Sequence, residues 1–506
     1  MSKKLRRKMM MSDTHHLGAS RTAREIKDWM PSTTSADSAL LPEITILQDR
    51  NQDLYRNNGI AAGVKQTSKD NVIGTGLRLN SKPNYRLLGK DITWANEFAK
   101  QAEALWEDYS ESVFFDAGLS LNFDAFTNLN YDSVIQNGEA AIIPLWIPGR
   151  GSKISTCFQA IDTARLCNPN NQIDTPSLRG GISFDQYGAP TAYHVKKTHP
   201  GDNYFMAGGE GWETIPARTE FGRKRFLHIF KKERPGQSRG KAIASSVLAA
   251  FNLLGKYQLT ELQAAHVNSK VAMILESDMS VEQACQMLGI TPQEYFTERN
   301  DWRGSLESAA TIKLPVGDKF NSHVPNRPAT AYVGYMEQLA REIGAGFNIP
   351  YELVMKDFSK TNYSSARAAL LEAWRFFHSE RRWFSSMWCD EVWMLILEEM
   401  VNKKMIDAPG FYQNKRAYCG AEWIGPGRGA IDPLKEGKAD IEELNNNLTT
   451  YKDAYAKRGK DYLQEFDQIA IEKAEMKERG ITVQDVSSRL SFKGNEYPED
   501  ESQEEL

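Results

Sequence analysis

The chain has 506 residues, of which 41% are hydrophobic and 25% are charged, and its formal net charge is −4. This length predicts two to four sub-domains, and the composition excludes a wholly disordered chain. A nearly neutral charge disfavours a protein that grips nucleic acid through a large basic surface, but it is compatible with one along which DNA slides.

The N-terminal residues and the cysteines predict a protein made in a cytoplasm. Residues 1–40 are polar and are expected to form a mobile arm, with order beginning near Leu41. The basic start lacks an apolar core, so a secretory signal is not expected. The longest uncharged run, 242–255, is too short for the roughly 18 residues that span a bilayer. Five dispersed cysteines without a C-x-x-C pair are typical of reduced thiols.

The first half of the chain is predicted to begin with helices and to continue into a β-rich region. Apolar spacing favours helices at 52–70 and 92–114, with a strand and turn at 71–79 between them. Short apolar runs between turn clusters then predict a subdomain of hairpins over 131–232. The turn clusters are PGRG at 148–151, NPNN at 168–171 and YGAP at 187–190.

The second half is predicted to be mainly helical. Helices are expected at 243–277, 332–347, 363–404 and, in several pieces, 436–480. A segment of mixed periodicity with four prolines covers 280–328, and a Gly/Pro-rich connector covers 405–435. Residues 481–506 read as an acidic disordered tail. The predicted fold class is therefore mixed α+β, predominantly helical.

No motif for catalysis, a cofactor or a metal stands out. The segment GQSRGK at 236–241 resembles a phosphate loop, but only three residues separate its glycines and Ala242 follows the lysine. None of the eight histidines has H-E-x-x-H spacing, and no G-x-S-x-G elbow occurs. We therefore expect no enzyme, no cofactor and no metal. A nuclease-type carboxylate cluster assembled from distant positions remains as an alternative.

A basic segment covers residues 223–241, with eight basic residues and one acid. One interpretation is a DNA-contacting loop. The other, which we favour, is a solvated loop or a source of ion pairs between subunits, for example with an acidic face such as 436–443. The candidate residues are Arg223, Lys224, Arg225, Lys231, Lys232 and Arg234.

Several stretches follow one another along the chain in an order that points to a family. They are ALLP at 39–42, DLYRNNGIAA at 53–62, NVIG at 71–74, NPNN at 168–171, HIF at 228–230, GQSRG at 236–240, NYSSARA at 362–368, EAW at 372–374, WIGPGRGAID at 423–432, TYK at 450–452, AKRG at 456–459 and DY at 461–462. Together they resemble the lambda-type family of tailed-bacteriophage portal proteins over about residues 20 to 480.

This resemblance implies a ring, usually of about twelve subunits, around a DNA channel at one capsid vertex. It implies a portal fold of wing, stem, clip and crown. The wing would be 41–242 with the helix 363–404. Stem helices within 243–347 would flank a clip at about 280–328, and the crown would be 436–480. The loop at 348–362 matches the tunnel loop, where Lys356, Lys360 and Asn362 are candidates for contact with DNA. The alternative for Lys356 and Lys360 is that they are two exposed lysines on a loop without a DNA role.

The same resemblance implies function and partners. The ring would nucleate procapsid assembly, conduct the genome during packaging and ejection, and dock the terminase and later the neck or tail. Expected partners are other copies of the chain, double-stranded DNA, terminase, major capsid and scaffold proteins, and neck or tail completion proteins, with no membrane. The location would be the virion, after assembly in the host cytoplasm, and residues 1–20 would be trimmed on maturation. Two alternatives are a nucleic-acid-processing enzyme (a terminase or nuclease) and a capsid or head-closure protein.

Overall fold

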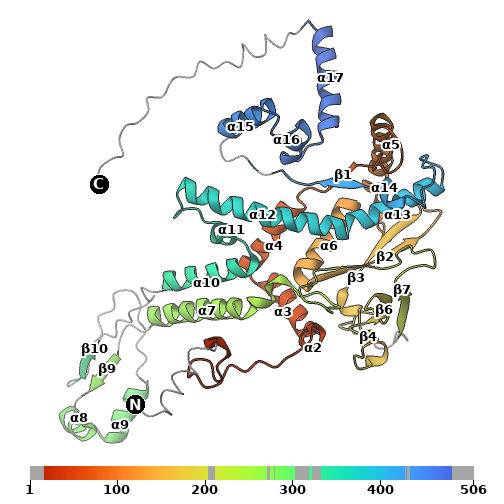
Figure 1. Ribbon diagram of the computed structural model, residues 1–506. Helices are drawn as coiled ribbons and strands as arrows, with labels where there is room; N and C mark the ends of the chain where they lie inside the picture. The colour runs from red at the N-terminus through yellow and green to blue at the C-terminus, as the bar shows by residue number, and fades with distance from the viewer. Residues whose placement is uncertain are drawn as a thin grey trace, which may run out of the picture. The chain divides into compact units, whose positions relative to one another are not determined.

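The computed structural model describes residues 16–202, 211–270, 274–277, 280–301, 318–321, 332–427, 429 and 433–480 (Figure 1). The chain forms two compact units. Unit 1 comprises residues 1–52, 85–242 and 387–419, and unit 2 comprises residues 53–84, 243–386 and 420–506. The predicted mixed, helix-dominated class is confirmed.

Unit 1 combines helices with two antiparallel sheets. One sheet has the order β3-β2-β8 and the other β4-β5-β6-β7. The strands are β2 (Glu139–Trp146), β3 (Thr156–Ile161), β4 (Leu178–Arg179), β5 (Ile182–Phe184), β6 (Pro190–Lys196), β7 (Trp212–Pro216) and β8 (Leu227–Phe230). The helices are η1 (Leu17–Ala19), α2 (Ala36–Leu40), the first part of α3 (Ile44–Asn57), α5 (Ile92–Ser110), η2 (Val113–Phe115), α6 (Phe123–Asn137), η3 (Thr163–Arg165), η4 (Pro169–Asn171), α13 (Cys389–Asn402) and α14 (Lys415–Tyr418).

Two cores hold unit 1 together. Aromatic rings from the helices and β3 pack around Trp388, whose indole N–H donates to the Thr127 hydroxyl at 2.9 Å. The partners of this cluster are Phe115, Phe123, Phe126 and Phe158. A second cluster takes side chains from both sheets, including Ala141, Tyr193 and Phe226. Because both sheets contribute to one apolar cluster, they pack as a single β-rich body.

Unit 2 is mainly helical. Its helices are α4 (Gly59–Val72), η5 (Ile243–Ser246), α7 (Leu248–Lys270), α8 (Val281–Leu288), α9 (Pro292–Asp301), α10 (Tyr332–Phe347), α11 (Tyr351–Met355), α12 (Tyr363–Met387, to Ser386), α15 (Pro433–Asn445), α16 (Tyr451–Lys457) and α17 (Tyr462–Glu478). Two antiparallel pairs join segments far apart in sequence: β1 (Arg78–Ser81) with β11 (Ala421–Ile424), and β9 (Ile274–Ser277) with β10 (Asp318–Asn321).

A half-buried arginine joins three segments of unit 2. The Arg381 guanidinium donates to the carbonyls of Asn71, Val72 and Pro426 at 2.7–2.9 Å. A Cβ on Gly425 would lie 2.5 Å from Arg381 Nε, so glycine leaves the space that the guanidinium fills. The stretches NVIG and WIGPG therefore meet at one side chain.

The first half of the chain differs from the sequence prediction in its boundaries. The helix predicted at 52–70 is interrupted at Asn58, whose side chain caps α4, and α4 continues to Val72, so the strand begins only at Arg78. The β-rich region starts at Glu139 rather than 131, because Asn122 caps the start of α6 and Gly138, at φ +84°, ends it. The helix predicted at 92–114 ends at Ser110, before η2.

In the second half, the helix predicted at 363–404 is divided into two helices, α12 and α13, with Trp388 between them. The Trp388 indole is buried there and hydrogen-bonds the Thr127 hydroxyl. The helix predicted at 243–277 ends at Lys270, and 274–277 form a strand instead, because they pair with 318–321. The helix predicted at 332–347 is found as α10, which buries Leu339, Ile343 and Phe347 along one face.

The expected terminal arms fall partly outside the described residues. Residues 1–15, which make up most of the 1–20 segment predicted to be trimmed, lie outside the described residues. The predicted tail, 481–506, also lies outside them. The same holds for 302–317 and 322–328, which belong to the expected clip. Order was expected to begin near Leu41, but α2 already starts at Ala36. Its Asp37 carboxylate anchors it by accepting from the Ser238 N–H at 2.8 Å and from Arg179 at 2.6 Å.

Candidate DNA-facing loop and basic segment

The 348–362 loop follows α10 through a tight reversal. Asn348 adopts φ +58°, and the Ile349 N–H bonds back to the Gly344 carbonyl at 2.9 Å. A Cβ on Gly344 would stand 2.7 Å from that Ile349 carbonyl oxygen, so the reversal requires glycine here. The short helix α11 then packs on α10 and α4, which gives the loop a fixed base.

Lys356 ends α11 in the left-handed conformation. Its φ is +54°, and its backbone N–H donates to the Glu352 carbonyl. The side chain is exposed, and within the described residues it makes no ion pair. A non-glycine residue at positive φ is uncommon, and the turn projects the ammonium group into solvent, where it is available to a phosphate.

Lys360 is tied to α10. Its ammonium lies 3.1 Å from Glu337 Oε2, and Arg341 lies 3.3 Å from Glu337 Oε1. The Glu337 side chain is 16% exposed, against 61% for Lys360. One carboxylate thus neutralises two cations in this conformation.

Asn362 caps α12. Its side-chain oxygen accepts from the Ser365 N–H at 2.8 Å, which satisfies one of the otherwise unpaired donors of the first helical turn. The structure thus gives this residue a role in starting α12 after the loop.

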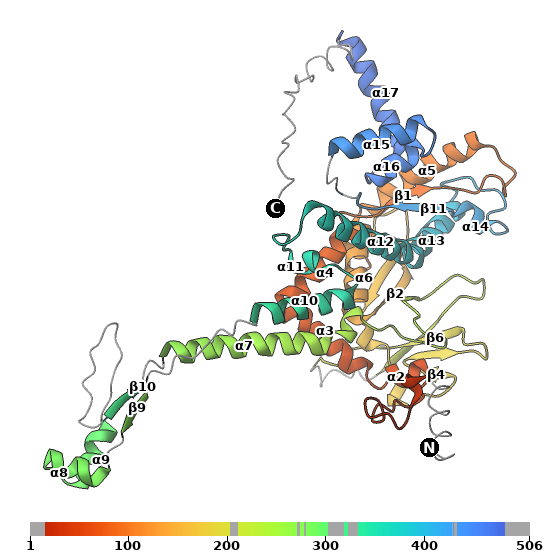
Figure 2. The ribbon, with the colours of Figure 1, turned by 60° about the vertical axis from the view of Figure 1, so that its left-hand side comes forward.

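The helices that precede the loop, α7 and α10, run side by side (Figures 1 and 2). Phe251 packs edge-on against Phe347, with ring centroids 6.1 Å apart. Tyr257 meets Tyr332 at 5.4 Å and Tyr335 at 5.1 Å. A Cβ on Gly346 would lie 2.2 Å from Val247 Cγ1, so the glycine allows close approach at that end.

Two residues of the basic segment pair with carboxylates of α13 inside unit 1. Arg223 lies 3.4 Å from Glu398 and donates to the Thr156 hydroxyl at 3.0 Å. Lys224 lies 2.5 Å from Glu391. These two cations hold the β8 region against α13.

The other candidates of the segment are exposed. They are Arg225, Lys231, Lys232 and Arg234. Arg234 donates to the Thr34 carbonyl at 2.8 Å, and Lys241 pairs with Glu233 at 2.7 Å. The segment is therefore divided between internal ion pairs and solvent-facing cations.

A buried charge cluster in the same segment was not predicted from the sequence. The Arg239 guanidinium binds both oxygens of Glu139 and donates to the carbonyls of Thr163, Leu166 and Gly180. His228 Nε2 lies 2.9 Å from the same carboxylate. Burial would raise the pKa of Glu139, but Arg239 and His228 hold that pKa well below its usual range, while burial lowers the pKa of His228.

The signal that could have revealed this cluster is the pair of glycines beside it. A Cβ on Gly138 would lie 2.2 Å from the Lys241 carbonyl carbon, and one on Gly240 would lie 2.1 Å from the Gly138 oxygen. Two glycines next to opposite charges indicate two backbones in contact around a buried ion pair.

Within the described residues, no group of three or more His, Cys, Asp or Glu side chains is placed to hold a metal ion. None of the helices in that part of the chain has the length and apolarity needed to cross a membrane.

Comparison with known proteins gives the family. Residues 22–381 match the model described as phage portal protein, lambda family. The chain belongs to this family. It is 31% identical to the portal protein of Escherichia phage N15 over 92% of this chain and 91% of that protein. It is 30% identical to portal protein B of Escherichia phage lambda over 92% and 90%. A probable portal protein of Halomonas phage phiHAP-1 is 24% identical over 88% of this chain and 83% of its own length.

Similarity to solved structures is weaker. A chain from the neck of an empty GTA particle matches 83% of this chain and 93% of its own length, with 11% identity and a TM-score of 0.45. The family assignment therefore rests on sequence alone.

Proposed function

We propose that the chain forms a ring of about twelve copies at one vertex of a phage capsid and surrounds the channel through which DNA is packaged and ejected. The ring would nucleate procapsid assembly, bind terminase, capsid and scaffold proteins, and later bind the neck or tail. The observation that best supports this proposal is the sequence match to the portal proteins of two phages along 92% of the chain. This protein would lie in the virion, after assembly in the host cytoplasm, and would have no catalytic role.

The surface of α7 supports a ring. Three leucines of α7, Leu253, Leu259 and Leu262, are 55%, 55% and 70% exposed. Large apolar side chains exposed together on one helix favour contact with further protein that encloses them. Neighbouring copies of α7 and α10 in a ring would supply that enclosure.

We propose the following parts of a portal along the chain. The wing comprises 41–242 with 363–404, the stem comprises α7 and α10, and the clip comprises the segment between them, about 280–328. The tunnel loop is 348–362, the connector 405–435, the crown 436–480 and the tail 481–506. The β9–β10 pair supports a clip that is closed at its base, because these strands bring residue 277 opposite residue 318.

Electron microscopy of the purified chain, with light scattering for mass, tests the assembly. We expect rings with a central hole and a mass near about twelve copies. A compact dimer that cleaves DNA in a divalent-metal-dependent manner would contradict the proposal and support the nucleic-acid-processing enzyme. That alternative is not favoured, since the three relatives described above carry portal names.

A further inference from the structure

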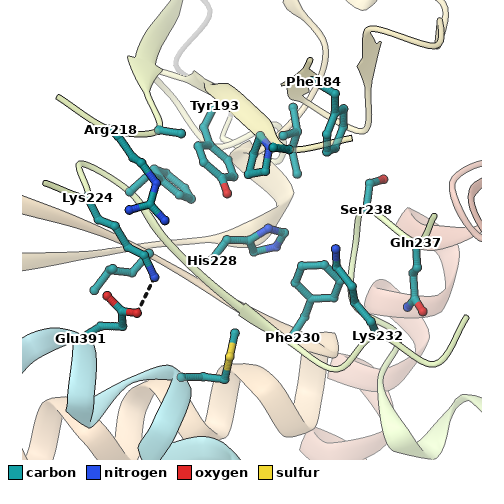
Figure 3. Close-up of a pocket in the computed structure, with 17 residues that line it drawn as sticks. Phe184, Tyr193, Arg218, Lys224, His228, Phe230, Lys232, Gln237, Ser238 and Glu391 are labelled. Carbon is teal, nitrogen blue, oxygen red and sulfur yellow. Dashed lines mark ion pairs between the residues drawn. The ribbon is translucent and has the colours of Figure 1, made fainter. Parts of the chain in front are cut away.

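Unit 1 contains an open pocket of about 300 Å³ that none of the roles above uses (Figure 3). It lies between β6 and β8 and is bordered by the start of α13. Its volume is at the lower end of the range for ligand pockets, roughly 300–1,000 Å³. That space fits one ring-sized group with a small polar neighbour.

Aromatic rings form its apolar wall. The rings of Tyr193 and Phe226 stack with centroids 4.1 Å apart. His228 stands edge-on to Tyr193 at 5.8 Å and tilts against Phe230 at 4.5 Å. Tyr193 and Phe226 are only 6% and 3% exposed, so the pocket meets the edges of buried rings. Ring edges at a pocket wall favour an aromatic ligand group through edge-to-face contact.

Two hydroxyl-bearing residues, Ser238 and Tyr193, line the pocket. Ser238 is 3% exposed, and its hydroxyl makes no hydrogen bond within the described residues, although Asp37 fixes its backbone N–H. The Tyr193 hydroxyl points toward the cavity in Figure 3. Burial raises the pKa of Tyr193 to about 12, so this group is a neutral donor near pH 7. A buried polar group left unpaired costs about 1–3 kcal/mol, so the Ser238 hydroxyl indicates a ligand acceptor.

The charge at the pocket is positive. Arg218, Lys224 and Lys232 line it together with one acid, Glu391. Lys224 and Glu391 neutralise one another at 2.5 Å. Lys232 makes no ion pair within the described residues, and Figure 3 shows its amine beside Phe230, directed at the space between His228 and Ser238. The lining therefore favours an aromatic group next to a carboxylate.

The chain itself carries such a sequence. Residues 496–506 contain six acids, no basic residue and one aromatic, Tyr497, within EYPEDE at 496–501. The described part of the chain ends at Gly480. Between Gly480 and Tyr497 the chain is able to extend over roughly 55–60 Å at about 3.3–3.6 Å per residue. That reach is about twice the diameter of a small domain.

We propose that this pocket binds the acidic C-terminal segment of a copy of this chain. The Tyr497 ring would lie against Tyr193 and Phe226, and a neighbouring carboxylate would accept hydrogen bonds from Lys232 and Ser238. The segment has both features that the lining selects, an aromatic ring and excess negative charge. The occupied pocket would tether the tail to the β-rich body of a subunit.

Photo-crosslinking in the full chain tests this assignment. A benzoylphenylalanine at position 497 retains an aromatic ring and links to the groups that it touches. We expect cross-linked peptides from 190–196 and 226–238, identified by mass spectrometry. Lys232→Glu should lower their yield about tenfold, which corresponds to the loss of one charge-assisted hydrogen bond. Cross-links confined to other parts of the chain would overturn the proposal.

Two further variants separate binding from folding. Arg225→Glu makes the same charge change on an exposed residue of the same segment outside the pocket, and it should leave the yield unchanged. Ser238→Ala removes a hydroxyl that has no partner within the described residues, so the fold should be kept while the yield drops about fivefold. Equal losses for Arg225→Glu and Lys232→Glu would mean general charge attraction and would reject the pocket as the site.

Discussion

At the residue scale, the Glu139–Arg239 pair connects the start of β2 to the loop after β8. Both side chains are almost completely buried, at 0% and 4% exposure, and the guanidinium also satisfies three backbone carbonyls. Replacing a whole buried pair with apolar groups often costs little, but removing one partner leaves an isolated buried charge. The stability of the β-rich body therefore depends on keeping both.

Glu139→Gln should lower the free energy of unfolding by about 3–5 kcal/mol, because Arg239 would keep its charge without a counter-ion. Chemical unfolding followed by tryptophan fluorescence measures this loss. The matched control is Glu233→Gln, which removes the same charge from the more exposed pair with Lys241 and should cost less than about 1 kcal/mol. Similar losses of unfolding free energy in both variants would show that the buried Glu139–Arg239 pair stabilises the fold no more than an exposed ion pair does.

At the element scale, glycines set how closely α16 approaches the connector. A Cβ on Gly427 would lie 2.4 Å from the Arg458 carbonyl carbon, and one on Gly459, which has φ +74°, would lie 2.8 Å from the Gly427 nitrogen. The stretches WIGPGRGAID and AKRG therefore touch through their backbones. Asp461, which caps α17, also hydrogen-bonds Asn80 of β1 and so extends this junction to the β1–β11 pair.

Gly427→Ala should separate these backbones and destabilise the junction by about 1–3 kcal/mol, the usual cost of overpacking. Hydrogen exchange by mass spectrometry should show faster exchange of the α16 and α17 amides, with unit 1 unchanged. Gly429→Ala is the control, since a Cβ there would meet no atom within 4 Å. If both variants exchange alike, the close contact at Gly427 does not hold the helices.

At the scale of the whole molecule, the sequence predicted element types better than element junctions. The buried face of α10 follows from its regular apolar spacing, and it packs against the nearby elements α7, α11 and η5. The break between α12 and α13 at Trp388 could not be predicted, because the residues on both sides keep helical spacing. The hydrogen bond of Trp388 to Thr127, which is distant in the sequence, becomes visible only in the structure. The ion pairs of Arg223 and Lys224 were hidden for the same reason, since their partners lie on α13, more than 160 residues later.

The last prediction concerns DNA retention by the ring as a whole. If Lys356 and Lys360 line a channel, their substitution by alanine removes two cations from every copy. Since each phosphate contact contributes a salt-dependent part of the affinity, Lys356→Ala/Lys360→Ala particles should lose packaged DNA more readily. Quantitative measurement of protected DNA across a salt series would detect this, and particles that package and retain DNA normally would refute a DNA role for the loop.

Two control variants test whether the loop lysines affect DNA retention by their position at the channel or only by their contribution to the net charge of the ring. Lys473→Ala/Lys477→Ala removes the same number of cations from exposed positions of α17 and should leave retention unchanged. Glu337→Gln frees Lys360 from its carboxylate partner, so it should strengthen retention in the same assay. An increase with Glu337→Gln that disappears when Lys360→Ala is added would identify the exchange of Glu337 for phosphate as the step by which the loop grips DNA.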